Sequence, residues 1–307
     1  MYRSLTSSVR SSALSQCSII SRRWIITDLA SYYLNLLLFV SLLGLTILGY
    51  WLIKWYRQKQ ELQRIAAMPF EEEDRSVLSR IKQYQYLSSE EKEKIERSIL
   101  RFMNTKNFIG AKLEVTEEMK VVISFYACLL LLHIDTENCY DNLKNIIIYN
   151  HPVMIDRVQN NGGIFSKEQF LIDGQSANDT VVIIWHDAKR EAYHPRKENV
   201  IVHEFAHEID FMDGEIDGVP PMERSKYHEW TNVLYKEFEK LNKVAMKNRD
   251  WGDYKFIGEY AATNEAEFFA VISERFFESP GSLKKKFPDL YNELKDFYGV
   301  DLAAKEA

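Results

Sequence analysis

The sequence predicts an α+β fold that is mainly helical, with a small β-sheet beside a central helix. A single transmembrane helix is expected to precede the folded domain in the chain. Three observations lead to this prediction. Most long segments repeat their apolar residues at helical spacing, whereas only short runs between residues 145 and 185 have the β-branched content of strands. An uncharged run of 25 residues near the N-terminus is also long enough to cross a bilayer.

Charge divides the 307 residues into a basic N-terminal part and an acidic remainder. Residues 1–67 carry eight basic and two acidic side chains, so the net charge of −6 for the whole chain leaves −12 on residues 68–307. This acidity argues against direct binding of nucleic acid by the folded part. The three cysteines, Cys17, Cys128 and Cys139, include no C-x-x-C pair, which is typical of free thiols in a reducing compartment.

The N-terminal segment predicts a membrane anchor. Residues 1–28 form a basic, serine-rich extension, whose composition is compatible with a transit peptide or with an extension that has no fold of its own. The uncharged run Leu29–Ile53 predicts a transmembrane helix, with a buried helix of a soluble protein as the alternative. Basic residues flank both ends, and their slight excess after the span, together with the unpaired cysteines, favours a single-pass protein of the cell inner membrane whose folded domain lies in the cytoplasm.

The folded domain is expected to occupy residues 88–307, after a juxtamembrane linker over residues 54–87. Within that linker, the charged run Glu71–Asp74 indicates either a solvated segment or the first turn of a helix. The domain opens with Ser88-Ser89-Glu90-Glu91, which has the pattern of a capping box at the start of a helix.

A second helix and then a small sheet follow. Thr116 is expected to cap a helix whose apolar run, Val121–Ile134, is too short to cross a membrane. The β-branched runs Ile146–Tyr149 and Thr180–Trp185 predict strands, and Asn160–Gly163 predicts a turn between extended stretches. An extended peptide could lie along the edge of such a sheet by main-chain hydrogen bonds.

The central element is a helix expected between Pro195 and Gly214, which contains one H-E-x-x-H motif. Positions i and i+4 lie on one helical face, so His203 and His207 can offer two imidazole nitrogens to a single cation. Glu204 lies beside them. Two neutral ligands, a position left for water and a base are what a zinc hydrolase needs, whereas the alternative is a helix whose histidines are hydrogen-bonded and inert.

A catalytic zinc normally has three protein ligands, and the third does not follow from the spacing alone. The metzincin pattern is excluded because it requires Gly and His where this chain has Asp210 and Asp213. His228 lies on the expected long helix Arg224–Lys247 and is most simply a surface residue. The candidates that remain are four carboxylates from later in the chain: Glu223, Glu265, Glu267 and Glu274.

Two further helices are expected near the C-terminus. Asn264 is a good N-cap for a helix that runs to about Glu278, where Pro280-Gly281 ends it. As part of the capping box Asn264-x-x-Glu267, Glu267 also has a purely structural interpretation. A last helix is expected from about Asp289 to Tyr298.

Several motifs resemble the Mlc titration factor A family of glucose-regulated zinc metallopeptidases. They are N-V-I-V-H-E-F-A-H-E-I-D, D-G-V-P-P and E-Y-A-A-T-N-E-A-E-F-F-A, and the likeness extends over most of residues 70–300. The resemblance implies a zincin-like metallopeptidase domain. In that family the two histidines of H-E-x-x-H bind zinc, the glutamate between them is the general base, and the glutamate that ends Y-x-x-x-x-x-x-E is the third ligand.

Here the Y-x-x-x-x-x-x-E motif runs from Tyr260 to Glu267. The resemblance therefore implies one Zn²⁺ per chain held by His203, His207 and Glu267, with Glu204 as the base. It also implies a catalytic role for Tyr260, whose phenol can donate to a developing oxyanion.

The resemblance implies aminopeptidase-type hydrolysis of peptide substrates, and also binding of a glucose-responsive transcriptional repressor. Two other classes of function compete with it. The first is a non-catalytic, membrane-tethered protein that sequesters a transcriptional regulator, which would have no need of Glu204. The second is an intramembrane protease, but about 150 residues separate the span from the H-E-x-x-H motif.

Overall fold

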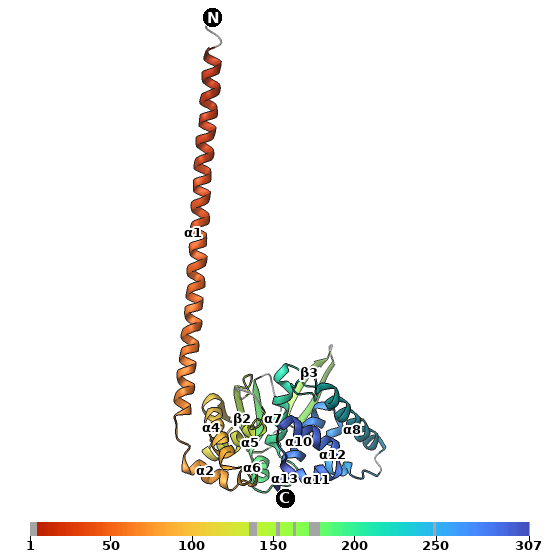
Figure 1. The fold of residues 1–307 in the computed structure, drawn as a ribbon. Helices are drawn as coiled ribbons and strands as arrows, with labels where there is room; N and C mark the ends of the chain where they lie inside the picture. The colour runs from red at the N-terminus through yellow and green to blue at the C-terminus, as the bar shows by residue number, and fades with distance from the viewer. Residues whose placement is uncertain are drawn as a thin grey trace. The chain divides into compact units, whose positions relative to one another are not determined.

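The computed structural model describes residues 5–134, 140–151, 154–161, 164–171, 179–247 and 250–306 (Figure 1). The chain forms two compact units, Met1–Arg64 and Ile65–Ala307. Cys139 and two residues of the predicted turn, Gly162 and Gly163, lie outside the described residues.

Helix α1 (Leu5–Ala66) runs through the first unit and contains the predicted span of residues 29–53. From Tyr32 to Ala66 this helix is long and apolar enough to cross a membrane, and it is the one such helix among the described residues. The described apolar side chains of the predicted span are exposed: Leu45 and Tyr50, for example, are 65% and 64% accessible. Such a surface is stable when lipid rather than water surrounds it.

The second unit begins with two short helices, α2 (Glu72–Ser79) and α3 (Lys82–Gln85). The acidic run at residues 71–74 forms the N-cap and first turn of α2, where negative side chains favour the positive end of the helix dipole. Leu78, Ile81 and Tyr84 are buried in the core of the unit. Part of the segment that the sequence suggests as a linker therefore packs with the folded domain.

The next two helices have the caps that the sequence predicts. α4 (Ser89–Thr105) opens with a complete capping box between Ser88 and Glu91. Thr116 caps α5 (Glu117–Leu130), in which every side chain from Val121 onward is buried. Because α5 is covered by protein on all sides, it is a core helix, as its length predicts.

A parallel sheet of three strands forms in the order β1-β2-β5: β1 (Asn107–Gly110), β2 (Asn145–Tyr149) and β5 (Thr180–Ile184). The two predicted strands are confirmed, although Trp185 begins helix α6 (Trp185–Tyr193) and does not end β5. β1 was not predicted, because a run of four residues with half-exposed side chains has no strong strand pattern.

A separate antiparallel pair comprises β3 (Met154–Asn161) and β4 (Ile164–Leu171). Its register joins Met154 to Leu171 and Asn161 to Ile164. The two strands are the extended stretches predicted on either side of the turn.

Helices make up the rest of the unit. They are α7 (Val200–Asp210), the 3₁₀ turn η1 (Phe211–Asp213), α8 (Tyr227–Lys247), α9 (Tyr254–Ile257), the 3₁₀ turn η2 (Tyr260–Ala262), α10 (Glu265–Glu278), α11 (Pro280–Lys286), α12 (Pro288–Tyr298) and α13 (Leu302–Glu306). α11 was not predicted: Pro280 ends α10 as expected, but it also occupies the first turn of a new helix, a position that favours proline.

Two helices form the centre of the second unit. α7 packs along α10 and also contacts α5 and β5, and Figure 1 shows α7 and α10 side by side near the middle of this unit. Both helices are buried along nearly their whole length, so polar groups on their facing sides need partners from each other.

Candidate metal centre

The helix that carries the H-E-x-x-H motif starts later than the sequence suggests. The expected start at Pro195 is wrong, because Asn199 is the N-cap and Val200 the first helical residue. The Asn199 side-chain oxygen accepts hydrogen bonds from the backbone N–H groups of Ile201 and Val202, both at 3.1 Å. An asparagine in this position satisfies donors that the first turn of a helix otherwise leaves unpaired.

Three potential ligand atoms converge from two helices. On α7, the Nε2 atoms of His203 and His207 lie 3.3 Å apart. On α10, Glu267 Oε2 lies 3.0 Å from His203 Nε2 and 3.4 Å from His207 Nε2. His203, His207 and Glu267 therefore form a candidate metal site.

The spacing of these atoms fits a tetrahedral Zn²⁺. Nitrogen or oxygen donors at about 2.0–2.1 Å from such an ion lie about 3.3 Å from one another. The chemistry of the donors points the same way. His203 Nδ1 lies 2.9 Å from Glu274 Oε1, so Nδ1 carries the hydrogen and the Nε2 lone pair of a neutral ring faces His207 and Glu267. Converging lone pairs need a cation or a proton between them.

The carboxylates around His203 also favour positive charge at this place. Burial alone would lower the pKa of His203, but the carboxylates of Glu267 and Glu274 raise it to about 10. Burial opposes ionisation of Glu267, yet hydrogen bonds from His203 and His207 hold its pKa well below the usual range. His207 Nδ1 is buried and has no hydrogen-bond partner among the described residues.

Glu204 lies on α7 directly after His203 and is only 3% exposed. Burial is the main cause that raises the pKa of Glu204; with the opposing charge of His203 and the added effect of the carboxylates of Glu267, Glu208 and Glu274, the pKa reaches about 8. A carboxylate whose pKa lies near neutrality is suited to accept and return a proton at physiological pH.

Tyr260 lies in the 3₁₀ turn η2, immediately before α10. Its ring centre is 5.8 Å from that of His203, and the side chain is 56% exposed. The phenol therefore lies next to the candidate site and remains open to a substrate that approaches from solvent.

The other carboxylates considered as third ligands do not join the three converging atoms. Glu265 is exposed at the start of α10, and Glu223 lies beside Met222 and Lys226 in a different hollow of the surface. Glu274 contacts His203, but through Nδ1 on the side away from His207. His228 is exposed and bonds to Asn232 on its own helix, α8.

The contact between Glu274 and His203 was not predicted. Glu267 and Glu274 are seven positions apart, which is two helical turns, so both carboxylates lie on the face of α10 that meets α7. That spacing was present in the sequence. However, the sequence does not reveal which helix α10 packs against, so the spacing alone could not distinguish a metal ligand from a residue that supports a ligand.

A family model described as glucose-regulated metallo-peptidase M90 matches residues 53–299. An uncharacterized protein of Synechocystis sp., slr2042, is 31% identical over 257 residues, which cover 80% of this chain and 89% of that protein. Proteins named Mlc titration factor A are more distant: that of Cronobacter sakazakii is 27% identical, over 81% of this chain and 92% of its own, and that of Klebsiella pneumoniae is 28% identical, over 83% and 94%.

Proposed function

Because this chain belongs to the glucose-regulated M90 family of metallopeptidases, we propose that it is a membrane-anchored zinc peptidase that hydrolyses peptide bonds, with aminopeptidase-type activity. The observation that carries the proposal is the convergence of His203, His207 and Glu267 within 3.4 Å, with a buried carboxylate, Glu204, on the same helix. This donor set, two imidazoles and one carboxylate, leaves a coordination position open, as catalytic zinc sites do.

His203, His207 and Glu267 would hold the metal. When bound, Zn²⁺ supplies Lewis acidity, which polarises a carbonyl group and lowers the pKa of water. Imidazole and carboxylate ligands with this spacing favour zinc over calcium or magnesium, which prefer six or more oxygen ligands.

The remaining chemistry belongs to protein groups. Glu204 accepts a proton from the attacking water and returns it to the nitrogen of the departing amine. Tyr260 donates its O–H to the carbonyl oxygen of the scissile bond as negative charge develops there. The exposure of Tyr260 supports this role, because a substrate that approaches from solvent can contact this side chain.

The test is the substitution Glu204→Gln in the full-length protein in detergent. Glutamine keeps the shape of the side chain but cannot take up the proton, so kcat toward a chromogenic aminoacyl substrate should fall about 10²–10⁴-fold. Zinc, measured by mass spectrometry, should stay at about one per chain, as in the wild type.

The matched control is Glu265→Gln, which alters an exposed carboxylate two positions from Glu267 and should change neither quantity. Wild-type turnover in the zinc-loaded Glu204→Gln protein would contradict the peptidase mechanism.

We also propose that the N-terminal helix α1 anchors the protein in the membrane. Residues 29–53 of α1 would cross the inner membrane once, with the second unit in the cytoplasm, since Lys54, Arg57, Lys59 and Arg64 follow the span.

A second candidate function is the sequestration of a transcriptional repressor by a membrane-tethered, non-catalytic protein. The name of the relatives, Mlc titration factor A, favours it, since that name describes proteins that titrate a regulator. The acidic charge of residues 68–307 supports contact with the regulator itself and not with DNA. Under this alternative, Glu204→Gln would leave the cellular effect on the regulator intact.

A further inference from the structure

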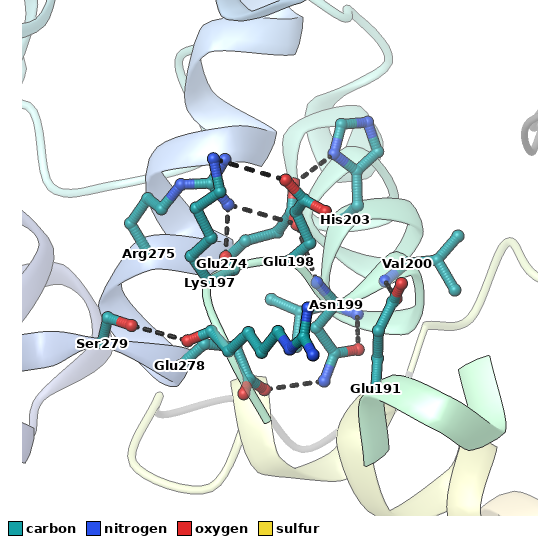
Figure 2. A network of polar contacts seen from close by, with 12 residues as sticks. Glu191, Lys197, Glu198, Asn199, Val200, His203, Glu274, Arg275, Glu278 and Ser279 are labelled. Carbon is teal, nitrogen blue, oxygen red and sulfur yellow. Dashed lines mark hydrogen bonds and ion pairs between the residues drawn. The ribbon is translucent and has the colours of Figure 1, made fainter. Parts of the chain in front are cut away.

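One carboxylate of α10 contacts α7 at two points. Glu274 Oε1 accepts the Nδ1–H of His203 at 2.9 Å, and Glu274 Oε2 accepts the backbone N–H of Asn199 at 2.8 Å. Figure 2 shows this carboxylate between the His203 ring and Arg275. Since Asn199 is the N-cap of α7, a single side chain fixes both the start of the helix and the first histidine of its motif.

The negative charge of Glu274 is buried but compensated. The side chain is 7% exposed, and the Arg275 guanidinium lies 3.5 Å from Oε2. Arg275 is itself held by three backbone carbonyl groups, those of Lys197, Phe256 and Ile257. A buried carboxylate with a fixed cation and two fixed donors has little freedom to move.

We infer that Glu274 is a positioning residue for the candidate metal site. It holds the hydrogen of His203 on Nδ1, which leaves the Nε2 lone pair for the metal, and it joins α7 to α10, which carry the three ligands between them. This inference rests on the proposed metal site and adds a residue to it. In known metal sites, removing such a partner of a ligating histidine costs about 10–100-fold in metal affinity.

The chain offers a matched comparison one turn further along α10. Glu278 Oε1 accepts hydrogen bonds from Asn199 Nδ2 at 2.7 Å and from Gln83 Nε2 at 2.9 Å. Glu278 therefore belongs to the same polar network and contacts the same cap residue (Figure 2), but among the described residues its hydrogen bonds go to amide groups and not to an imidazole. Replacing its carboxyl group by an amide should not alter the metal site.

The experiment compares Glu274→Gln with Glu278→Gln in the full-length protein. A glutamine at 274 has one acceptor oxygen, so it satisfies only one of the two donors and turns an N–H toward the other. The dissociation constant for Zn²⁺, measured by competition with a chromogenic chelator, should rise about 10–100-fold in Glu274→Gln and stay at the wild-type value in Glu278→Gln.

A spectroscopic readout separates positioning from a general loss of structure. Substituted Co²⁺ reports ligand geometry through its visible absorption, which should change in Glu274→Gln and not in Glu278→Gln. If Glu274→Gln fails to fold, Glu274→Asp keeps both oxygens on a shorter side chain and should bind zinc with an affinity between those of the wild type and a site without the carboxylate.

The outcomes distinguish this inference from the proposed function. Wild-type protein that binds no zinc would overturn the metal site itself. Wild-type protein that binds zinc, together with a Glu274→Gln or Glu274→Asp protein of equal affinity and unchanged Co²⁺ spectrum, would overturn the inference and leave the peptidase proposal standing.

Discussion

At the scale of single residues, Tyr260 is the group whose proposed role can be tested with least disturbance. It is 56% exposed, and its ring packs beside His203 without entering the core. Tyr260→Phe removes only the hydroxyl, so the protein should fold normally and keep its zinc. If the hydroxyl stabilises the oxyanion, kcat should fall about 10²–10³-fold with little change in KM. An unchanged kcat in the zinc-loaded variant would remove Tyr260 from the mechanism.

Glu278 links the polar network to the pH dependence of stability. Burial raises its pKa to about 8 in the folded protein, from 4.5 for an ordinary glutamate. Its contribution to stability is therefore complete below pH 4.5 and is lost as the pH rises through 8, since the unfolded chain releases this proton first. The corresponding slope is at most about 1.4 kcal/mol per pH unit.

Glu278→Gln tests this dependence, because glutamine resembles the protonated acid but does not titrate. Thermal unfolding midpoints measured between pH 5 and 8 should fall more steeply in the wild type than in the variant. The difference between the two curves isolates Glu278 from the other groups that titrate in this range. Parallel curves would show that Glu278 ionises normally in the folded protein.

The residues of the candidate site differ in how far the sequence could predict them. His203, Glu204 and His207 follow from the period of one helix, which is local information. Glu267 does not, because its partner His203 is 64 positions away and spacing along the chain says nothing of how two helices pack. Only the family resemblance separated it from Glu223, Glu265 and Glu274. The identity of the metal and the roles of Glu204 and Tyr260 stay predictions.

At the scale of secondary-structure elements, the predictions of helices and strands were most accurate where the sequence has a helix cap or a strong hydrophobic periodicity. Both predicted N-caps of the first half, Ser88 and Thr116, accept hydrogen bonds from the expected backbone groups. The elements that were missed are short. β1 has four residues, and α6 begins at Trp185 without a side-chain cap, so neither has a local signal strong enough to stand out.

The connection between α7 and α10 shows how a loop can hold two functional helices in place. Gly218, in the loop after α7, has φ +79°, and a Cβ at this position would lie 2.5 Å from the backbone oxygen of Glu265. Its N–H donates to Asp210 Oδ2 at the end of α7. A glycine is required both by the left-handed conformation and by the close approach to the first turn of α10. The loop and Glu274 thus join the same two helices at opposite ends of α7.

At the scale of the whole molecule, the testable feature is the topology of the anchor. With residues 29–53 across the inner membrane and the second unit in the cytoplasm, a protease added to spheroplasts should leave the second unit intact. Lysis of the same spheroplasts should expose it to digestion, which serves as the control. The second unit is detected with an antibody raised against it. Its degradation in unlysed spheroplasts would reverse the proposed orientation.

The separation of the ligands along the chain also has a consequence for how the protein is made. A ribosome releases the N-terminal part of a chain first, so the two histidines of α7 emerge before Glu267 and Glu274 of α10. A nascent or prematurely terminated chain that ends before α10 has the two imidazoles but lacks both the proposed third ligand, Glu267, and the proposed positioning residue, Glu274. If Glu267 is the third ligand, the proposed peptidase therefore gains its hydrolytic capacity only once translation has passed α10.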